Sequence, residues 1–278
     1  MRPSDVLRRA TRYLEAHEVD GAKESAETLL AGVLGTDRAG LYSRSEGLSS
    51  AEARTFGRAL CLRCTGTPLQ HLTGEQPFRH LALRVRRGVF VPRPETELLA
   101  GEVLAAIAGA SEPLIADVGT GTGAIALSIK SEHPDARVFA TDLSREAVAL
   151  ARENASQLGL QIDVREGSLL TPLPGELRES FDAVVSNPPY IPTGELEELS
   201  AEVLADPRLA LEGDIDVYDE LADQAASWCR PGGVLAVEIG ATQREAVSDV
   251  FGRRGFNHAR TVKDLAGRER IVIGKRRA

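Results

Sequence analysis

The chain contains few cysteines and no long apolar run. Cys61, Cys64 and Cys229 are the three cysteines among 278 residues, too few for a disulfide framework. No uninterrupted apolar stretch approaches the roughly 20 residues that a membrane-spanning helix requires. The opening segment, Met1–Val6, also lacks the apolar core of a signal peptide. We therefore expect a cytoplasmic protein without a membrane segment.

Aromatic side chains are scarce as well, at 4% of the residues, and the net charge is −8. Nucleic-acid-binding proteins usually carry a basic stripe and aromatic stacking platforms, so both figures disfavour a nucleic-acid substrate. Residues 1–91 hold 14 basic and 10 acidic side chains, a net of +4, whereas residues 92–278 hold 19 and 31, a net of −12. The first third is the better candidate for docking a partner protein. Its Arg84, Arg86 and Arg87 are either part of that surface or solvated residues of a strand edge.

Cys61 and Cys64 could seed a zinc site together with His71 and His80. Structural zinc, however, prefers four ligands at tighter spacing. The segment has a helical pattern, in which positions i and i+3 share a face. We interpret both cysteines as buried or partly buried packing thiols and expect no bound metal.

Two kinds of pattern divide the chain. Apolar residues recur at helical spacing through residues 3–72, where Ser49 and Glu52 form a predicted capping box. Apolar alternation over residues 76–91 predicts a β-hairpin. The predicted division is a helical substrate-binding domain (1–75), a hairpin linker (76–94) and a larger domain (95–278).

From residue 114 onward, short apolar segments alternate with segments of helical pattern. This alternation predicts an α/β fold with a doubly wound, mainly parallel sheet, in which ligands bind at the C-terminal strand ends. The last two strands are separated by only a turn, and we expect them to pair antiparallel. The predicted strands are 114–118, 137–142, 161–166, 181–186, 233–239, 256–263 and 269–274, and the predicted helices are 123–131, 144–158, 214–229 and 241–254.

The first of these strands ends in a glycine-rich turn, Asp117-Val118-Gly119-Thr120-Gly121-Thr122-Gly123. Glycines let a backbone approach a ligand closely, and the N–H groups at the start of the following helix point outward. The spacing G-x-G-x-G differs from the dinucleotide fingerprint G-x-G-x-x-G. The next strand ends in Asp142, and an acidic residue at that place can accept both hydroxyls of a ribose. Together these features predict a ribose-containing ligand.

The predicted strand 181–186 runs into Asn187-Pro188-Pro189-Tyr190. Neither proline has an N–H group, so the Asn187 side chain and the nearby carbonyls form a set of acceptors beside one aromatic ring. Such a set suits a planar NH₂ group that is held by its hydrogens while its nitrogen attacks an electrophile. As a purely structural element, the segment would be a rigid strand-to-loop turn.

The glycine-rich turn, Asp142 and the Asn-Pro-Pro-Tyr segment resemble those of S-adenosylmethionine-dependent methyltransferases that modify planar NH₂ groups. Pro68–Gly74 and Phe90–Glu97 resemble signatures of the HemK/PrmC family, the peptide chain release factor N5-glutamine methyltransferases. The similarity extends from about residue 5 to the C-terminus. It implies a class I methyltransferase fold, with a seven-stranded, mainly parallel sheet, a small N-terminal helical domain and a β-hairpin linker.

The resemblance implies that S-adenosyl-L-methionine methylates the side-chain N5 of the glutamine in the Gly-Gly-Gln loop of class I peptide chain release factors. A release factor is then the expected partner; stable nucleic-acid binding and a membrane are not expected, and nothing requires more than a monomer. The implied catalytic residues are Asn187, Pro188 and Tyr190. The implied cofactor-binding residues are Asp117, Gly119, Thr120, Gly121, Thr122, Gly123, Asp142, Ser168, Leu169 and Asn187. The implied substrate-binding residues are Asn187, Pro188, Pro189, Tyr190, Arg93 and Glu95.

The chain departs from the family pattern at two places. Ser168 and Leu169 stand where the family usually has an acidic residue followed by an aromatic one, so we expect weaker readout of adenine without loss of binding. Val217 replaces a usual glycine after Asp216, which leaves the conformation of that loop open.

A carboxamide nitrogen is a poor nucleophile because its lone pair is delocalised into the carbonyl. We therefore expect catalysis by position and electrostatics. The Asn187 oxygen and the Pro188 carbonyl would accept the two N–H groups, while Tyr190 would pack on the amide plane. Two alternatives stay open: a nucleic-acid amino-methyltransferase acting on adenine or guanine, and a non-catalytic nucleotide-binding module or dehydrogenase.

Overall fold

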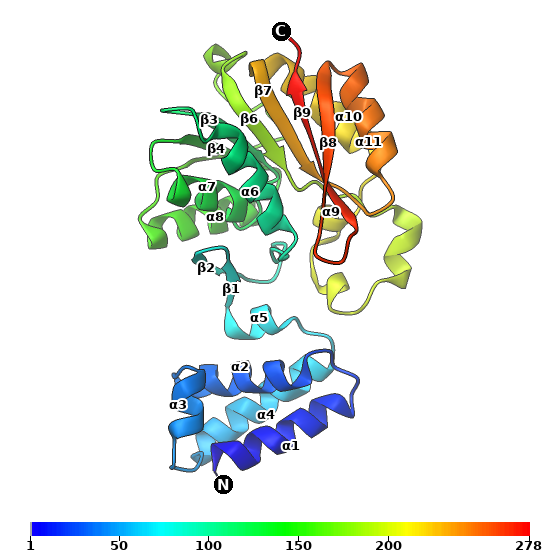
Figure 1. Cartoon of the computed structure of the whole chain (residues 1–278). Coiled ribbons are helices and arrows are strands. Elements are labelled where there is room, and N and C mark those ends of the chain that lie inside the picture. Colours follow the sequence, from blue (N-terminus) through cyan, green and yellow to red (C-terminus); the bar gives the residue numbers. More distant parts are fainter. Residues whose placement is uncertain (1) are drawn as a thin grey trace. The chain divides into compact units, whose positions relative to one another are not determined.

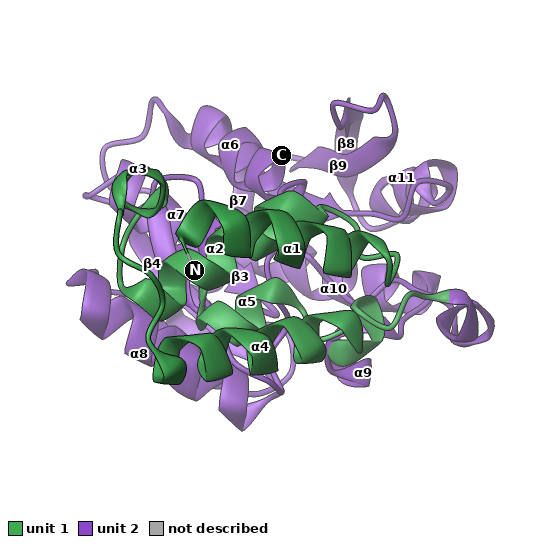
Figure 2. Ribbon diagram, turned by 90° about the horizontal axis from the view of Figure 1, so that it is seen from below, with its two compact units in different colours: residues 1–75, 199–205 green, residues 76–198, 206–278 purple. Residues whose placement is uncertain are grey.

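The computed structural model describes residues 2–278 and divides the chain into two compact units. Unit 1 runs to Glu75 and also includes Leu199–Ala205 (Figure 2). Unit 2 comprises Gln76–Glu198 and Asp206–Ala278. The short segment 199–205 therefore interrupts unit 2 in the sequence and contributes to the other unit.

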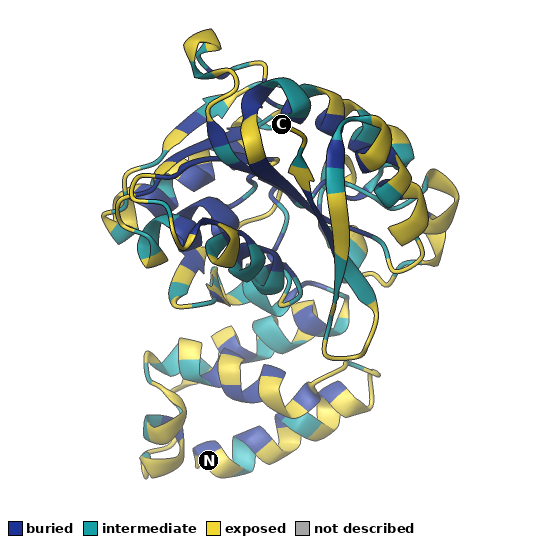
Figure 3. Ribbon diagram, turned by 45° about the horizontal axis from the view of Figure 1, so that its top comes forward, coloured by how far each residue is buried: buried dark blue, intermediate teal, exposed yellow. Residues whose placement is uncertain are grey.

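Unit 1 is helical, with a small core of its own. Leu14, Leu30 and Leu41 are fully buried in it, and the buried and exposed residues alternate along its helices at helical spacing (Figure 3). The predicted capping box is confirmed: the Ser49 side chain accepts the Glu52 N–H at 3.2 Å, and the Glu52 carboxylate accepts the Ser49 N–H at 2.6 Å. The helices are α1 (Pro3–Glu15), α2 (Ala22–Leu34), α3 (Arg38–Ser43), α4 (Ser50–Cys64) and α5 (Leu69–Thr73), with the 3₁₀ turn η3 (Val203–Ala205).

Unit 2 is built on a seven-stranded sheet with the order β5-β4-β3-β6-β7-β9-β8 (Figure 1). The five strands from β5 to β7 are parallel. Strand β9 pairs antiparallel with β8, as predicted, and it also pairs antiparallel with β7. In this sheet β3 comes first in the sequence, and β4 and β5 follow it toward one edge. The next strand, β6, lies on the other side of β3, so the strand order reverses between β3 and β6. The strands are β3 (Leu114–Val118), β4 (Arg137–Asp142), β5 (Asp163–Glu166), β6 (Phe181–Ser186), β7 (Cys229–Glu238), β8 (Phe256–Lys263) and β9 (Glu269–Arg276).

Helices cover both faces of the sheet (Figure 1). In strand β3, successive side chains point to opposite faces of the sheet, and both faces are apolar. Ile115 belongs to one core cluster, whereas Leu114 and Ala116 belong to the other, and all three are buried. One face is covered by α6 (Thr96–Ile107), α7 (Ala124–Glu132) and α8 (Arg145–Leu158), and the other by α10 (Ile215–Trp228) and α11 (Arg244–Arg253). Short elements in the connections are η1 (Gly175–Leu177), η2 (Thr193–Glu198) and α9 (Arg208–Leu211).

The predicted hairpin is shorter than expected. Its strands are β1 (Glu75–Phe78) and β2 (Leu81–Arg84), and residues 85–91 are not in a strand. The chain turns where the Val89 N–H donates to the Arg86 carbonyl at 3.3 Å. Val89 is nevertheless buried, against Ala147 and Leu150 of α8. The apolar alternation after residue 84 therefore reflects burial of a loop, and the prediction of a strand there was wrong.

The cysteines differ in their surroundings. Cys229 is buried and Cys64 is half-buried, but Cys61 is exposed, so the expectation of a packing thiol was wrong for Cys61. Within residues 2–278, no three His, Cys, Asp or Glu side chains are grouped as metal ligands. The same residues include no helix that is long and apolar enough to span a membrane.

Candidate active site

The glycine-rich turn connects the end of β3 to the start of α7. Gly119, Gly121 and Gly123 all have positive φ angles, of 70°, 56° and 85°, which favour glycine over other residues. A methyl group added to Gly119 or Gly121 would meet nothing within 4 Å, whereas one on Gly123 would lie 3.0 Å from Leu127 Cδ1. The first two glycines thus leave the backbone open to an approaching ligand, and the third allows close packing of the helix.

Asp117 holds this turn from within the protein. Its Oδ2 accepts hydrogen bonds from Thr120 Oγ1 at 2.6 Å and from the Ala126 N–H at 3.1 Å. Its Oδ1 is buried and has no hydrogen-bond partner among the described residues. Complete burial raises the pKa of the Asp117 carboxyl to about 7, because the charged form loses its hydration. The structure thus gives Asp117 a role in shaping the turn.

Asp142, at the end of β4, contacts the same turn. Its Oδ2 accepts the Gly121 N–H at 2.8 Å, and its Oδ1 accepts the Ser144 N–H at 2.9 Å. Burial raises the pKa of Asp142 above its ordinary value, and the backbone donors oppose that shift. Each carboxylate oxygen can accept a further hydrogen bond, so two ligand hydroxyls could still be bound here.

The segment after β5 is tied to the end of β4. The Gly167 N–H donates to the Asp142 carbonyl at 2.9 Å, and Thr141 Oγ1 donates to the Leu169 carbonyl at 2.7 Å. Ser168 and Leu169 are both half-buried, and Leu169 has a positive φ of 48°. The structure thus brings Ser168 and Leu169 to the same sheet edge as Asp142.

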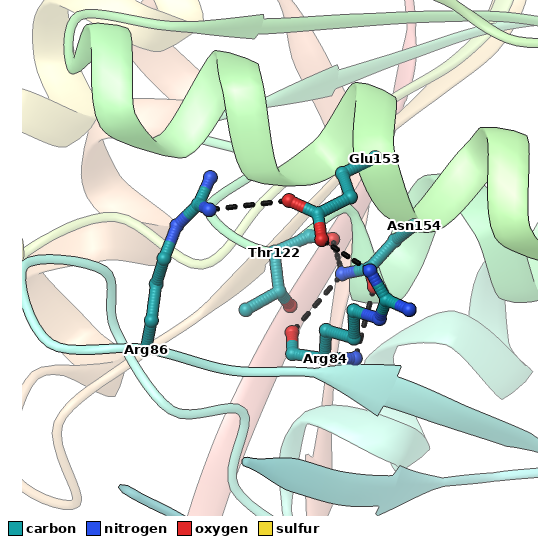
Figure 4. Close-up of polar contacts among 5 residues, drawn as sticks. All are labelled: Arg84, Arg86, Thr122, Glu153 and Asn154. Carbon is teal, nitrogen blue, oxygen red and sulfur yellow. Dashed lines mark hydrogen bonds and ion pairs between the residues drawn. The ribbon is translucent and has the colours of Figure 1, made fainter.

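Asn154 of α8 joins the turn to the hairpin (Figure 4). Its Nδ2 donates to the Thr122 carbonyl at 2.9 Å and to the Arg84 carbonyl at 3.1 Å, and its Oδ1 accepts the Arg84 N–H at 2.9 Å. The neighbouring Glu153 pairs with Arg84 at 2.5 Å and with Arg86 at 3.1 Å at the surface. Two of the three arginines considered for partner docking are therefore ion-paired within unit 2.

The Asn-Pro-Pro-Tyr segment follows β6 directly, beside the reversal of strand order. Asn187 Nδ2 donates to Thr96 Oγ1 at 3.2 Å, and Thr96 Oγ1 donates to Glu238 Oε2 at 2.7 Å. The Tyr190 hydroxyl donates to the other oxygen of Glu238, Oε1, at 3.4 Å. Among the described residues, no group donates to Asn187 Oδ1. The amide oxygen of Asn187 is therefore available to a ligand.

Glu238, the last residue of β7, is buried at the centre of this cluster. Burial raises the pKa of its carboxyl to about 7. Thr96 and Arg270 stabilise the charged carboxylate and partly oppose this rise in the pKa. Burial and the charge of Glu238 likewise raise the pKa of the Tyr190 hydroxyl, which stays protonated and acts as a donor. The Tyr190 carbonyl accepts a hydrogen bond from Gln243 Nε2 at 3.0 Å, which further fixes the segment.

The loop after the motif is held in turn by residues 211–213. The Ile191 N–H donates to the Leu211 carbonyl at 2.9 Å, and the Gly213 N–H donates to the Ile191 carbonyl at 3.0 Å. A methyl on Gly213 would lie 2.0 Å from the Pro189 carbonyl oxygen, so this close approach requires glycine. Val217 lies within α10 and has a negative φ, which explains how it replaces a glycine without strain.

Arg93 and Glu95 precede α6, and Glu95 is directly before Thr96 in the sequence. Arg93 Nη2 pairs with Asp206 Oδ2 at 2.5 Å, while Asp206 Oδ1 accepts the Val91 N–H at 3.1 Å. Glu95 is half-buried, and its charge contributes to the raised pKa of Glu238. A substrate contact of Arg93 or Glu95 stays a prediction.

Two family descriptions match the chain. Residues 94–213 match the methyltransferase small domain, and residues 5–74 match the PrmC N-terminal domain. The chain is 42% identical over 279 residues to a release factor glutamine methyltransferase of Moorella thermoacetica, covering 98% of each chain. It is 40% identical to that of Deinococcus radiodurans, covering 99% of each. The chain belongs to the release factor glutamine methyltransferase family.

The fold of this release factor glutamine methyltransferase family member is that of class I methyltransferases, as predicted. A solved structure, the Thermus thermophilus 16S rRNA N2 G1207 methyltransferase in complex with AdoMet and guanosine, superposes with a TM-score of 0.54. It is 19% identical and covers 73% of this chain and 50% of that chain, which shows a shared fold.

Three residues with contacts in this family member's site were not among the site residues predicted from the sequence: Thr96, Asn154 and Glu238. Glu238 carried a usable signal, because it is a charged residue at the end of the otherwise apolar run Val234–Val237. Asn154 lies inside the predicted helix 144–158 and carried no comparable signal. Thr96 lies within Phe90–Glu97, the segment that resembles a family signature, but no role of its own was predicted for it from the sequence.

Proposed function

We propose that this chain transfers a methyl group from S-adenosyl-L-methionine to the side-chain N5 of the glutamine in the Gly-Gly-Gln loop of class I peptide chain release factors. The orientation of Asn187 carries the proposal: its amide nitrogen is committed to Thr96, which leaves its oxygen to a substrate N–H. Membership of the release factor glutamine methyltransferase family supports the same activity.

The chemistry needs a carboxamide nitrogen that can attack. Asn187 Oδ1 and the Pro188 carbonyl would each accept one N–H of the substrate glutamine, which favours a nitrogen with its lone pair aimed away from both acceptors. Alignment of this kind can lower a barrier by ~7–11 kcal/mol. As the new C–N bond forms, the bond between the methyl carbon and the cofactor sulfur would break, and its electron pair would stay with the sulfur. The substrate nitrogen would then be positively charged and acidic, and it would lose a proton to water.

The glycine-rich turn fits S-adenosyl-L-methionine, because open space adjoins the backbone of Gly119 and Gly121. We propose that Asp142 accepts the ribose hydroxyls and that Ser168 and Leu169 border the adenine. The remaining residues proposed to line this part of the site are Asp117, Thr120, Thr122, Gly123 and Asn187. When bound, the cofactor supplies an electrophilic methyl group on a positively charged sulfur.

The partner is proposed to be a class I release factor. The helical domain over residues 1–75 would bind it, with the linker over 76–94 leading to the catalytic domain over 95–278. Pro189, Tyr190, Arg93 and Glu95 would border the bound glutamine. The competing function, methylation of an amino group in nucleic acid, is not favoured, since relatives that match nearly the full length are release factor glutamine methyltransferases.

One assay tests the proposal. Tritiated S-adenosyl-L-methionine is offered with a class I release factor, with the same factor lacking its loop glutamine, with tRNA and with DNA. Label should enter the intact release factor alone. The Asn187→Ala variant should lose roughly 10²–10³-fold in kcat while its affinity for S-adenosyl-L-methionine stays within about twofold. Label in nucleic acid alone would overturn the proposal.

A further inference from the structure

We propose that Thr96 and Glu238 are positioning residues, which fix the side-chain amide of Asn187 with its oxygen toward the substrate. This inference rests on the proposed function and adds two residues to it. Neither is expected to touch the reacting atoms. Both act through the hydrogen-bond chain from Asn187 Nδ2 to Thr96 Oγ1 at 3.2 Å and from Thr96 to Glu238 Oε2 at 2.7 Å.

The donors and acceptors in these two hydrogen bonds follow from which of the three side chains carry a hydrogen to donate. An ionised carboxylate can only accept, so the single hydroxyl hydrogen of Thr96 is directed to Glu238. Thr96 Oγ1 can then only accept from Asn187, and the group that faces it must be the NH₂ group. The reversed amide would place two acceptors against each other. Glu238 thus selects one of two amide orientations that have nearly the same shape.

The three side chains are held by rigid elements. Asn187 follows the end of β6 and Glu238 ends β7, and these strands are paired in parallel up to Ser186 and Val237. Thr96 is the first residue of α6. Thr96 and Glu238 are 3% and 2% exposed, so water does not readily replace either of them as a partner.

The selection depends on the charge of Glu238. A protonated Glu238 carries its own hydrogen and can donate it to Thr96, which frees the Thr96 hydroxyl to donate to the Asn187 oxygen. The side chains facing Glu238 are Thr96 and Glu95 from the α6 region, Tyr190 after β6 and Arg270 of β9. Tyr218 of α10 donates to the Glu238 carbonyl at 3.2 Å.

Among these groups, Arg270 favours the charged carboxylate and Glu95 opposes it. Burial outweighs both and raises the pKa of Glu238 to about 7. The carboxylate is therefore lost as the pH falls through about 7. The Asn187 orientation should be uniform at pH 8 and mixed at pH 6.

A first test reads the Asn187 side chain without any substrate. Its NH₂ signals in a ¹⁵N–¹H spectrum are identified as the pair missing from the Asn187→Asp variant. In the unmodified protein they should shift between pH 8 and 6 with a midpoint near 7. The Glu238→Gln variant removes the titrating group and should show no such midpoint. The proposal would be overturned if the chemical shifts of these signals do not change with pH in the unmodified protein, or if they change with the same midpoint in Glu238→Gln.

A second test uses turnover with saturating release factor and S-adenosyl-L-methionine. Thr96→Val keeps the shape of the side chain but removes the hydroxyl, and kcat should fall roughly 10- to 100-fold. Thr96→Ser keeps the hydroxyl and should retain at least about half of the kcat. Cofactor affinity should be similar in both variants. Thr96→Val leaves Glu238 and the Asn187 amide without this buried partner and should lower the thermal transition, so kcat is compared at a temperature at which both variants are folded. Equal kcat values for the Val and Ser variants would contradict the positioning role.

The two tests separate this inference from the proposed function. A release factor that is not methylated would refute the function, whereas the NMR titration reports on the amide in any case. Methylation with a normal Thr96→Val rate would refute the inference alone. In the unmodified enzyme, kcat should decrease between pH 8 and pH 6, and Glu238→Gln should lose this decrease. An unchanged decrease in Glu238→Gln would contradict the role of the Glu238 charge.

Discussion

Asp142 Oδ2 accepts a hydrogen bond from the Gly121 N–H at 2.8 Å, which joins the end of β4 to the glycine-rich turn after β3. One carboxylate therefore both supports the turn and faces the proposed ribose position. Asp142→Ala should remove both contributions and weaken S-adenosyl-L-methionine binding roughly 10- to 100-fold, measured by calorimetry. At saturating cofactor, kcat should change much less.

The matched control for Asp142 is Asp135→Ala, which removes an exposed carboxylate before the same strand. Its cofactor affinity should equal that of the unmodified protein. Unchanged affinity in Asp142→Ala, with an intact thermal transition, would remove the proposed ribose role.

Gly213 gives a prediction about the loop after the motif. An added methyl would lie 2.0 Å from the Pro189 carbonyl oxygen, so Gly213→Ala must push the two segments apart. We expect a kcat lower by roughly tenfold or more, because a displacement near 1 Å misaligns the reacting groups. Gly194→Ala is the control, since Gly194 lies exposed in η2, within the same connection between β6 and α10, and its added methyl would meet nothing within 4 Å. Comparable kcat values in both variants would show that the spacing at Gly213 has no catalytic role.

The central strands were predictable because buried parallel strands read as short apolar runs. The bounds of β3, β4 and β6 agree with the predicted 114–118, 137–142 and 181–186. Strand β7 begins at Cys229, earlier than the predicted 233. The Pro231-Gly232-Gly233 segment hid its beginning, since proline and glycine argue against a strand interior and here mark an irregular pairing.

The residues of the candidate site that lie at a strand end could be predicted from the sequence, because each depends on the position of only one strand. The glycine-rich turn lies at the end of β3, Asp142 ends β4 and Asn187 follows β6, and parallel strands bring such ends to one edge. Thr96 and Glu238 are 142 positions apart, and their hydrogen bond depends on how α6 packs near β7. Nothing in the composition of residues 199–205 indicated that they belong to unit 1.

Asn154 yields a prediction about stability. Asn154→Ala removes three hydrogen bonds and leaves the carbonyl of Thr122 and the backbone of Arg84 without that partner. The free energy of unfolding should fall by about 2–3 kcal/mol, measured by urea denaturation. Glu153→Ala in the adjacent position breaks surface ion pairs and should have a smaller effect. An Asn154→Ala loss no larger than that of Glu153→Ala would contradict the bridging role.

The raised pKa of Asp117 should make the free energy of unfolding depend on pH. Burial raises the pKa of its carboxyl in the folded protein to about 7, above the value of about 3.9 expected in the unfolded chain. The folded protein therefore holds a proton that the unfolded chain releases between these values. The stability from this group is fully present below about pH 3.9 and is lost as the pH rises through 7.

The Asp117→Asn variant isolates this effect, because its amide oxygen can still accept from Thr120 and Ala126 but does not titrate. Relative to this variant, the unmodified protein should lose up to about 1.4 kcal/mol of unfolding free energy per pH unit between pH 5 and 7. Urea unfolding of both proteins measures the difference, in which the titration of Glu238 cancels. Thr120→Val removes a donor that lowers the pKa of Asp117, so it should move the upper end of this window to higher pH. A stability difference that is flat or rises with pH would contradict a carboxyl that is protonated in the folded state.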